Sequence, residues 1–102
     1  MITNLRNNHL FIFAKITPKP EHYLAARDAL AGIVERTRSE EGCHAFSLLE
    51  NESEGLLCLY EEFTDEAALD YHYRQSYTQE VFELYKDWLA SAVEVTKMQY
   101  VA

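Results

Sequence analysis

Apolar runs with the composition of strands alternate along the chain with segments of helical spacing. Residues 9–17 form a mostly apolar run, rich in branched and aromatic side chains and closed by Pro18 and Pro20, which predicts a strand. After Pro20 the apolar positions recur at i, i+3, i+4 and i+7, which predicts a helix over residues 21–39. Gly42 marks the exit from this helix.

Two further strand-like runs lie close together in the middle of the chain. Residues 43–51 and 56–63 are rich in apolar side chains, and the polar residues 51–55 between them include the glycine that a hairpin loop favours. We therefore expect the two strands to pair antiparallel.

The last third of the chain predicts a broken helical region and a final strand. Thr64 and Asp65 supply a helix cap, and the helix they begin reaches about Arg74. Ser76 and Gln79 match a capping-box pattern, which predicts a second helix from Ser76 to about residue 90. Branched and aromatic residues return over 93–101 and predict a fourth strand.

The resulting order, β-α-β-β-α-β, predicts an α+β fold of ferredoxin-like topology: a four-stranded antiparallel sheet with helices on one face. Residues 9–102 form the single domain of this prediction, and residues 1–8 form a loose tail. The first strand is apolar on both sides, with Ile12 on one parity and Phe11 and Phe13 on the other. Because the chain's own helices cover only one face, we expect a homodimer through the open face of the sheet.

Composition and charge narrow the class of protein. The chain has 102 residues, of which 48% are hydrophobic, the size and balance of one globular domain. Its formal net charge of -8 disfavours nucleic acid as a partner. Neither a signal peptide nor an apolar run of membrane-spanning length is present, so we expect a cytoplasmic protein without a membrane partner, with Cys43 and Cys58 reduced and buried.

His72 is the most promising candidate for chemistry. No glycine-rich phosphate loop occurs, and no cysteine or histidine pair has metal-ligand spacing, so we expect neither a metal nor a cofactor. On its short helix His72 could move a proton near neutral pH, although a structural role on the helix surface or at an interface is the alternative. For His9, His22 and His44 the structural role is favoured, with His9 and His22 solvated.

Aromatic and acidic residues surround this candidate in the sequence. The aromatic side chains of residues 71–88 suit an apolar pocket for a flat ligand, or else simply form the core. By parity, one of Glu61 and Glu62 faces inward. The acidic pair Glu40 and Glu41 is interpreted as part of a solvated turn.

Three stretches of this sequence resemble the signatures of a known family. They are Glu-Glu-Gly-Cys-His at 40–44, Tyr-Glu-Glu-Phe at 60–63 and Asp-Glu-Ala-Ala-Leu-Asp-Tyr-His at 65–72. They are similar to those of the antibiotic biosynthesis monooxygenase superfamily of dimeric α+β barrels. The resemblance implies homodimers whose sheets pack face to face. Among the family's activities are cofactor-independent oxygenation of aromatic polyketides, quinol monooxygenation, haem degradation and isomerisation of a phosphorylated autoinducer sugar.

Positions at which this sequence departs from the family patterns favour some of these activities over others. Phe63 stands where the oxygenases often have Trp, and Leu59 stands where the polyketide enzymes have Asn. Ala14 replaces the Asn of the haem-degrading pattern, which also needs a histidine on the last helix, and no histidine follows His72. His72 matches the histidine shared by the quinol-monooxygenase-like and autoinducer-isomerase-like branches, although both usually continue with a Pro-His pair that is replaced here at 76–77.

The main hypothesis is a cofactor-independent monooxygenase that acts on a small phenol, hydroquinone or polyketide-like aromatic. In it His72 is catalytic and removes a phenolic proton, and the substrate-binding residues are Leu59, Glu61, Phe63, Tyr77 and Tyr85. The first alternative is an isomerase or degradative enzyme for a small carbonyl compound, with His72 and Glu61 as an acid–base pair. The second alternative is a non-catalytic dimeric module that binds a small ligand.

Overall fold

The computed structural model describes residues 5–102. Its strands are β1 (Leu10–Ile16), β2 (Cys43–Asn51), β3 (Leu56–Phe63) and β4 (Glu94–Gln99). Its helices are α1 (Tyr23–Ala31), α2 (Val34–Arg38), α3 (Glu66–Arg74) and α4 (Ser76–Trp88), with short 3-10 turns at η1 (Leu5–Asn8), η2 (Pro20–His22) and η3 (Glu52–Glu54).

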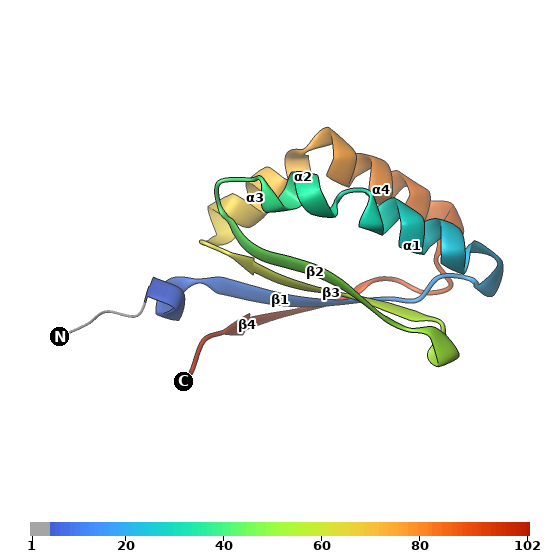
Figure 1. The fold of residues 1–102 in the computed structure, drawn as a ribbon, viewed down its shortest axis with the longest axis horizontal. Coiled ribbons are helices and arrows are strands. Elements are labelled where there is room, and N and C mark those ends of the chain that lie inside the picture. The colour runs from blue at the N-terminus through green and yellow to red at the C-terminus, as the bar shows by residue number, and fades with distance from the viewer. Residues whose placement is uncertain (1–4) are drawn as a thin grey trace.

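The four strands form one antiparallel sheet in the order β2-β3-β1-β4. All four helices lie on one face of this sheet, and the opposite face is bare (Figure 1). This arrangement confirms the predicted ferredoxin-like α+β fold. The strands match their predicted ranges to within one or two residues: β1, β2 and β3 carry apolar runs bounded by turn residues, and β4 is marked by branched side chains.

The alternation of side chains along β1 decides which residues form the core. Ile12, Ala14 and Ile16 face the helices and are buried, and Leu57, Leu59 and Phe63 of β3 join them on the same face. On the bare face Phe11 lies opposite Glu62 and Phe13 lies opposite Tyr60. Phe13 and Tyr60 remain half-exposed in the single chain, and Leu49 and Met98 are exposed.

The first predicted helix is divided in two. α1 ends at Ala31 and α2 begins at Val34, with Gly32 and Ile33 forming the turn between them. The Ile33 N–H donates to the Leu30 carbonyl in a tighter, 3-10-type turn. Glycine has a poor helix propensity, which explains an interruption that the apolar spacing alone does not predict.

The two predicted helix caps have different outcomes. The Asp65 side chain accepts a 2.9 Å hydrogen bond from the Ala68 N–H, so the predicted cap of α3 is confirmed. The capping box at Ser76 is wrong: Gln75 is the N-cap of α4, without a side-chain bond, and Gln79 donates instead to the Tyr73 carbonyl. A break of one residue between α3 and α4 leaves no room for an independent cap.

Gly42 lies where the turn after α2 passes close to α3. The Thr64 N–H donates to its carbonyl at 2.9 Å, and a Cβ built on Gly42 would overlap the Cβ of Ala68. We therefore expect Gly42→Ala to lower the free energy of unfolding by about 1–3 kcal/mol, measured by urea denaturation. Gly32→Ala is the matched control, because its Cβ would meet no atom closer than 3.4 Å. A Gly42→Ala protein as stable as the Gly32→Ala protein would contradict this packing argument.

Part of the expected N-terminal tail is ordered against the sheet. Residues 1–4 of the expected tail lie outside the described residues, and Leu5–Asn8 form η1, in which Arg6 donates to Glu62 at 3.0 Å. No helix within residues 5–102 is long and apolar enough to cross a membrane.

Candidate functional site

A cavity of about 150 Å³ lies between the helices and the sheet. Most of its wall is apolar and comes from both layers, with Ala14 and Leu59 from the sheet and Val81 from α4. Two lining side chains are well exposed, Val95 at 49% and Phe82 at 36%, so the cavity opens to solvent between β4 and α4. Its polar lining comes from a few side chains that belong to three different elements.

His72 is held in the wall of this cavity by a buried carboxyl group. Its Nδ1 lies 2.8 Å from Oε2 of Glu40, and both side chains are almost fully buried. The imidazole packs against two phenyl rings, with ring centroids 5.4 Å from Phe46 and 5.3 Å from Phe63. A carboxylate accepts a hydrogen bond from Nδ1–H, so the neutral imidazole carries its proton on Nδ1 and its lone pair on Nε2.

Tyr77 completes the network around Glu40. Its hydroxyl donates to the same Glu40 Oε2 that contacts His72. Burial and this hydrogen bond raise the pKa of Tyr77 above its ordinary value, so Tyr77 stays protonated and remains a donor. The Arg36 guanidinium lies 4.8 Å from the centre of the Tyr77 ring. Oε2 of Glu40 therefore accepts two hydrogen bonds, while Oε1 is buried with no partner among the described residues.

The interpretation of Glu40 as part of a solvated turn is wrong. Its side chain is buried because it continues the inward face of α2: Ile33, Thr37 and Glu40 follow each other at helical spacing and are all buried. The backbone fixes its position, since Glu40 N–H donates to Thr37 and its carbonyl accepts from Cys43. The i, i+4, i+7 spacing from Ile33 is the sequence signal that could have identified it.

Glu61 is the carboxyl group that faces the cavity from the sheet. It is 5% exposed, lines the cavity, and has no hydrogen-bond partner among the described residues. Burial raises the pKa of Glu61 to about 8, and the negative charge of Glu40 adds to this effect. Burial, with Glu61 nearby, also raises the pKa of Tyr85. At neutral pH Glu61 is thus mainly a neutral hydrogen-bond donor inside the cavity.

This raised pKa predicts a pH-dependent stability. The folded chain keeps a proton on Glu61 that the unfolded chain releases above about pH 4.5, so the stabilisation is fully present below that pH and is lost as pH rises through about 8. Glu61→Gln stays neutral and does not lose this stabilisation. The free energy of unfolding of wild type should therefore fall by about 2–4 kcal/mol more than that of Glu61→Gln as the pH rises from 5 to 9. Urea denaturation across this range measures it, with the exposed Glu54→Gln as control. Parallel pH profiles of wild type and Glu61→Gln would contradict the assignment.

The structure brings together some of the predicted site residues and separates others. Leu59, Glu61, His72 and Tyr85 all line the cavity. Phe63 is fully buried behind the His72 ring, and Tyr77 contacts Glu40, so neither is among the lining residues. Sequence reasoning missed two polar groups at this site, Glu40 and the cavity-lining Thr78.

The other charged and cysteine residues singled out in the sequence lie away from the cavity. Glu62 faces the bare side of the sheet. Burial opposes its ionisation, but hydrogen bonds from His9 at 2.6 Å and from Arg6 lower the pKa of Glu62. The prediction that His9 is solvated is therefore wrong. Cys43 and Cys58 are free thiols as expected, although both are half-buried rather than buried.

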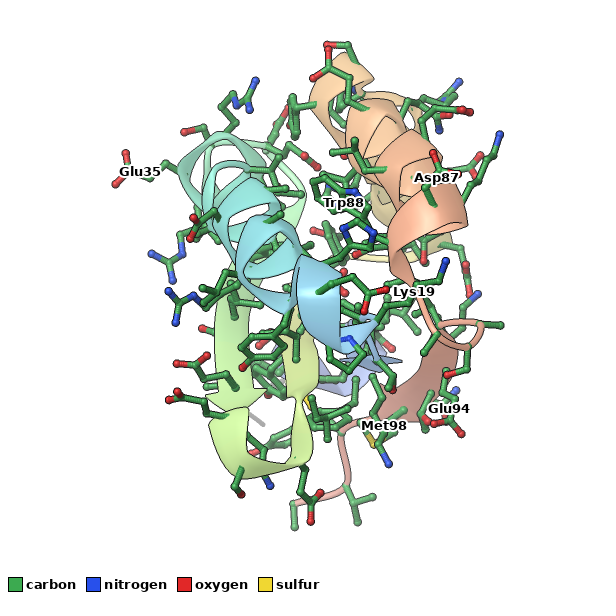
Figure 2. All side chains as sticks on the ribbon, turned by 90° about the vertical axis from the view of Figure 1, so that its right-hand side faces the viewer. Lys19, Glu35, Asp87, Trp88, Glu94 and Met98 are labelled. Carbon is green, nitrogen blue, oxygen red and sulfur yellow. The ribbon has the colours of Figure 1, made fainter. Side chains whose placement is uncertain are left out.

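The aromatic side chains of α4 divide between two roles. Trp88 points from α4 into the space between α4 and α1 (Figure 2), where its ring lies 6.0 Å from that of His22. Its carbonyl accepts a hydrogen bond from the Lys19 N–H at 2.8 Å. Trp88 therefore joins the ends of the two helices, while Phe82 and Tyr85 line the cavity.

Sequence and structure comparisons match this chain to the same group of proteins. The sequence model of the antibiotic biosynthesis monooxygenase (ABM) family matches residues 10–84, a range that contains Glu40, Glu61, His72 and Tyr77. Among solved structures, Rv0793 from Mycobacterium tuberculosis superposes with a TM-score of 0.87 at 26% identity and covers 92% of this chain and 96% of that one. A crystal structure described as an antibiotic biosynthesis monooxygenase has a TM-score of 0.84 at 28% identity, covering 91% and 99%.

Curated relatives match over shorter stretches. "Putative monooxygenase Rv0793" of Mycobacterium tuberculosis is 34% identical over 61 residues, which is 60% of this chain and 60% of that protein. "Uncharacterized protein sll1783" of Synechocystis is 35% identical over 83 residues, which is 79% of this chain. The matches span 60% and 54% of the length of these two relatives.

Proposed function

Because this chain belongs to the antibiotic biosynthesis monooxygenase family, we propose that it oxygenates a single-ring phenol or hydroquinone in the cavity, with His72 as the base. The observation that carries this proposal is the buried contact of 2.8 Å between Glu40 Oε2 and His72 Nδ1 in the cavity wall. A carboxylate that orients a histidine is a common arrangement for proton transfer.

The proposed first step is removal of a phenolic proton by Nε2 of His72. The imidazolium that forms is stabilised by Glu40, and the phenolate is electron-rich enough to react with O₂ directly. Phe46 and Phe63 pack against the ring of His72, so little reorientation is needed when the ligand binds. Tyr77 keeps Glu40 in place by donating to the same oxygen.

The overall reaction balances without an added reductant. A hydroquinone and O₂ give a hydroxyquinone and water: one oxygen atom enters a ring C–H position and the other leaves as water. The substrate loses the four electrons that O₂ gains. The proton taken by His72 returns to the oxygen that leaves as water. We therefore propose that neither a flavin nor a metal is required.

The size and charge of the cavity narrow the substrate. A cavity of about 150 Å³ in an apolar core is known to accommodate one benzene ring, so the volume favours a single ring over a polycyclic polyketide. The lining includes Glu61 and His72 but neither Lys nor Arg. This disfavours a phosphorylated sugar, the substrate class of the isomerase alternative.

The experiment that tests this function is oxygen uptake with a panel of alkyl-substituted hydroquinones, in the presence of EDTA and without added flavin. We expect uptake of one O₂ per hydroquinone, no hydrogen peroxide, and one labelled oxygen in the product when ¹⁸O₂ is supplied. Release of hydrogen peroxide with unlabelled quinone would identify an oxidase instead. Absence of substrate-dependent uptake across the panel would contradict the proposal.

We also propose that the bare face of the sheet packs against a second copy of the chain, in the cytoplasm. Phe13, Tyr60, Leu49 and Met98 lie on this face and are half-buried or exposed in the single chain, which leaves large apolar side chains in need of cover. Light scattering of the wild-type protein should give twice the mass of one chain. Phe13→Glu places a charge in the proposed interface, so this variant should have the mass of a single chain. A monomeric wild type at micromolar concentration would contradict this part.

A further inference from the structure

Glu61 is a buried carboxyl group of the cavity wall that the His72 network does not use. It is 5% exposed and lines the cavity from β3. Its two oxygens have no hydrogen-bond partner among the described residues, and neither is completely enclosed, in contrast to Oε1 of Glu40. Because the rest of the side chain is buried in the wall, the free oxygens of Glu61 are open to the cavity.

Glu61 and His72 share two immediate neighbours. Phe46 of β2 lies directly opposite Glu61, and Phe63 follows two residues later on the same face of β3. Both phenyl rings pack against the His72 imidazole, with centroids at 5.4 and 5.3 Å. One benzene ring fills a cavity of about 150 Å³. A ring whose hydroxyl faces His72 therefore also lies against Glu61.

From this arrangement we infer that Glu61 is a second catalytic residue, which protonates the peroxide formed on the substrate ring and then removes the ring proton so that the O–O bond breaks. The inference rests on the proposed function, because it assigns a later step of the same oxygenation. It makes Glu61 the residue that determines whether an oxygen atom stays on the ring.

Two proton transfers by Glu61 complete the reaction. The ring carbon next to the phenolate oxygen bonds to one atom of O₂, and the other atom becomes a peroxide anion that takes the proton of Glu61. The Glu61 carboxylate then takes the proton from this ring carbon. The C–H electron pair forms the new C=O bond, and the O–O pair leaves with hydroxide.

This sequence restores both residues and balances. The hydroxide takes the proton of the His72 imidazolium and becomes water, while Glu61 holds the proton that came from the ring carbon. Hydroquinone and O₂ have then given a hydroxyquinone and water. No further acid, base or reductant is consumed.

The acidity of the groups around the cavity favours Glu61 for this role. With a pKa of about 8, Glu61 holds a proton at neutral pH and releases it readily to a more basic peroxide anion. Burial raises the pKa of Tyr73 and of Tyr85, so these hydroxyls are weaker acids. Oε2 of Glu40 already accepts two hydrogen bonds and its Oε1 is enclosed, so Glu40 is not available to the ring.

Loss of the Glu61 carboxyl group predicts a specific change of product. When the ring proton is not removed, the second hydroxyl of the hydroquinone loses its proton instead. Hydroperoxide then leaves with the electron pair of its C–O bond. Hydroquinone and O₂ have in that case given quinone and hydrogen peroxide, and no oxygen atom from O₂ remains on the ring.

The test is the product ratio of Glu61→Gln with hydroquinone and ¹⁸O₂ at about pH 6.5, where the wild-type carboxyl group keeps its proton. Glutamine has a similar size and still donates a hydrogen bond, but it transfers no proton. The ratio of labelled hydroxyquinone to hydrogen peroxide should fall by about 10²-fold. Glu54→Gln, at an exposed position, is the control and should keep the wild-type ratio.

Two further variants keep the test independent of how well Glu61→Gln folds. Glu61→Asp retains a carboxyl group and should keep hydroxyquinone as the main product. Glu61→Ala should release hydrogen peroxide, and added formate should restore the hydroxyquinone, because this small acid fits the space that the side chain leaves. Failure of both Glu61→Asp and formate to favour the hydroxyquinone would overturn the inference.

The outcomes separate this inference from the function on which it rests. If wild type and Glu61→Gln form labelled hydroxyquinone in the same ratio to hydrogen peroxide, the role of Glu61 is contradicted and the monooxygenase stands. If wild type itself releases hydrogen peroxide with unlabelled quinone, both proposals are contradicted. Absence of oxygen uptake by wild type would likewise overturn both.

Discussion

Replacement of His72 by asparagine is expected to lower kcat/KM for hydroquinone oxygenation by about 10²–10⁴-fold, the usual contribution of a positioned general base. The amide N–H of the asparagine side chain would lie near the position of the His72 Nδ1–H and still donate to Glu40, so the buried carboxyl keeps a partner. What is lost is Nε2, the atom to which the base function is assigned. Oxygen-electrode assays with the best substrate of the panel measure the effect.

The control for this variant is His44→Asn. His44 is exposed and bonds to Thr64 rather than lining the cavity, so its replacement should change kcat/KM less than threefold. Hydroquinone binding by His72→Asn under nitrogen should remain within about threefold of wild type. A His72→Asn protein that is folded and fully active would contradict the assignment of His72 as the base.

Replacement of Glu40 by glutamine is expected to lower kcat about 10²-fold while KM changes less than threefold. Glutamine keeps the volume of Glu40 and one acceptor oxygen that can face His72 and Tyr77, but it removes the negative charge that stabilises the imidazolium of His72. Glu40 touches no reacting atom, so it is a positioning residue, and a split between kcat and KM is the readout that a purely structural role would not produce.

Two control variants distinguish an effect of the Glu40 charge on kcat from an effect on folding. Glu41→Gln removes the same charge from the adjacent, exposed side chain and should be neutral. Tyr77→Phe removes one hydrogen bond to Glu40 but leaves the carboxylate, so it should cost less than tenfold in kcat. Equal losses in kcat and in thermal stability for Glu40→Gln and Tyr77→Phe would show that the network serves folding alone.

The fold was predictable because apolar runs of strand length, bounded by turn residues, mark the strands. β1 and β3 are long apolar runs in which successive side chains point to opposite faces of the sheet. Their observed ranges are close to the predicted ones. The helices were less certain at their ends. Apolar spacing continued smoothly through Gly32 and Ile33, yet the chain turns there, because a break in backbone hydrogen bonding does not alter the apolar pattern.

The candidate site was only partly predictable because it depends on contacts between distant elements. His72 and Glu61 were identified by their types and positions on a helix and a strand. Glu40 lies 32 residues before His72 in the sequence, and two adjacent glutamates after a helix usually indicate a solvated turn. Thr78 gives no signal as a single hydroxyl in a helix, since what singles it out is a missing partner, which only the packed structure can establish.

If His72 takes a proton from a phenol bound in the cavity, an anaerobic absorbance measurement detects the phenolate that forms. 4-Cyanophenol is titrated with protein at a pH where the free compound is mostly neutral, and the longer-wavelength phenolate band is followed. We expect the bound phenolate fraction to exceed that in solution for wild type and to fall to the solution value or below for His72→Asn. A neutral phenol bound to the wild-type protein, or an equal phenolate band in both proteins, would contradict the account.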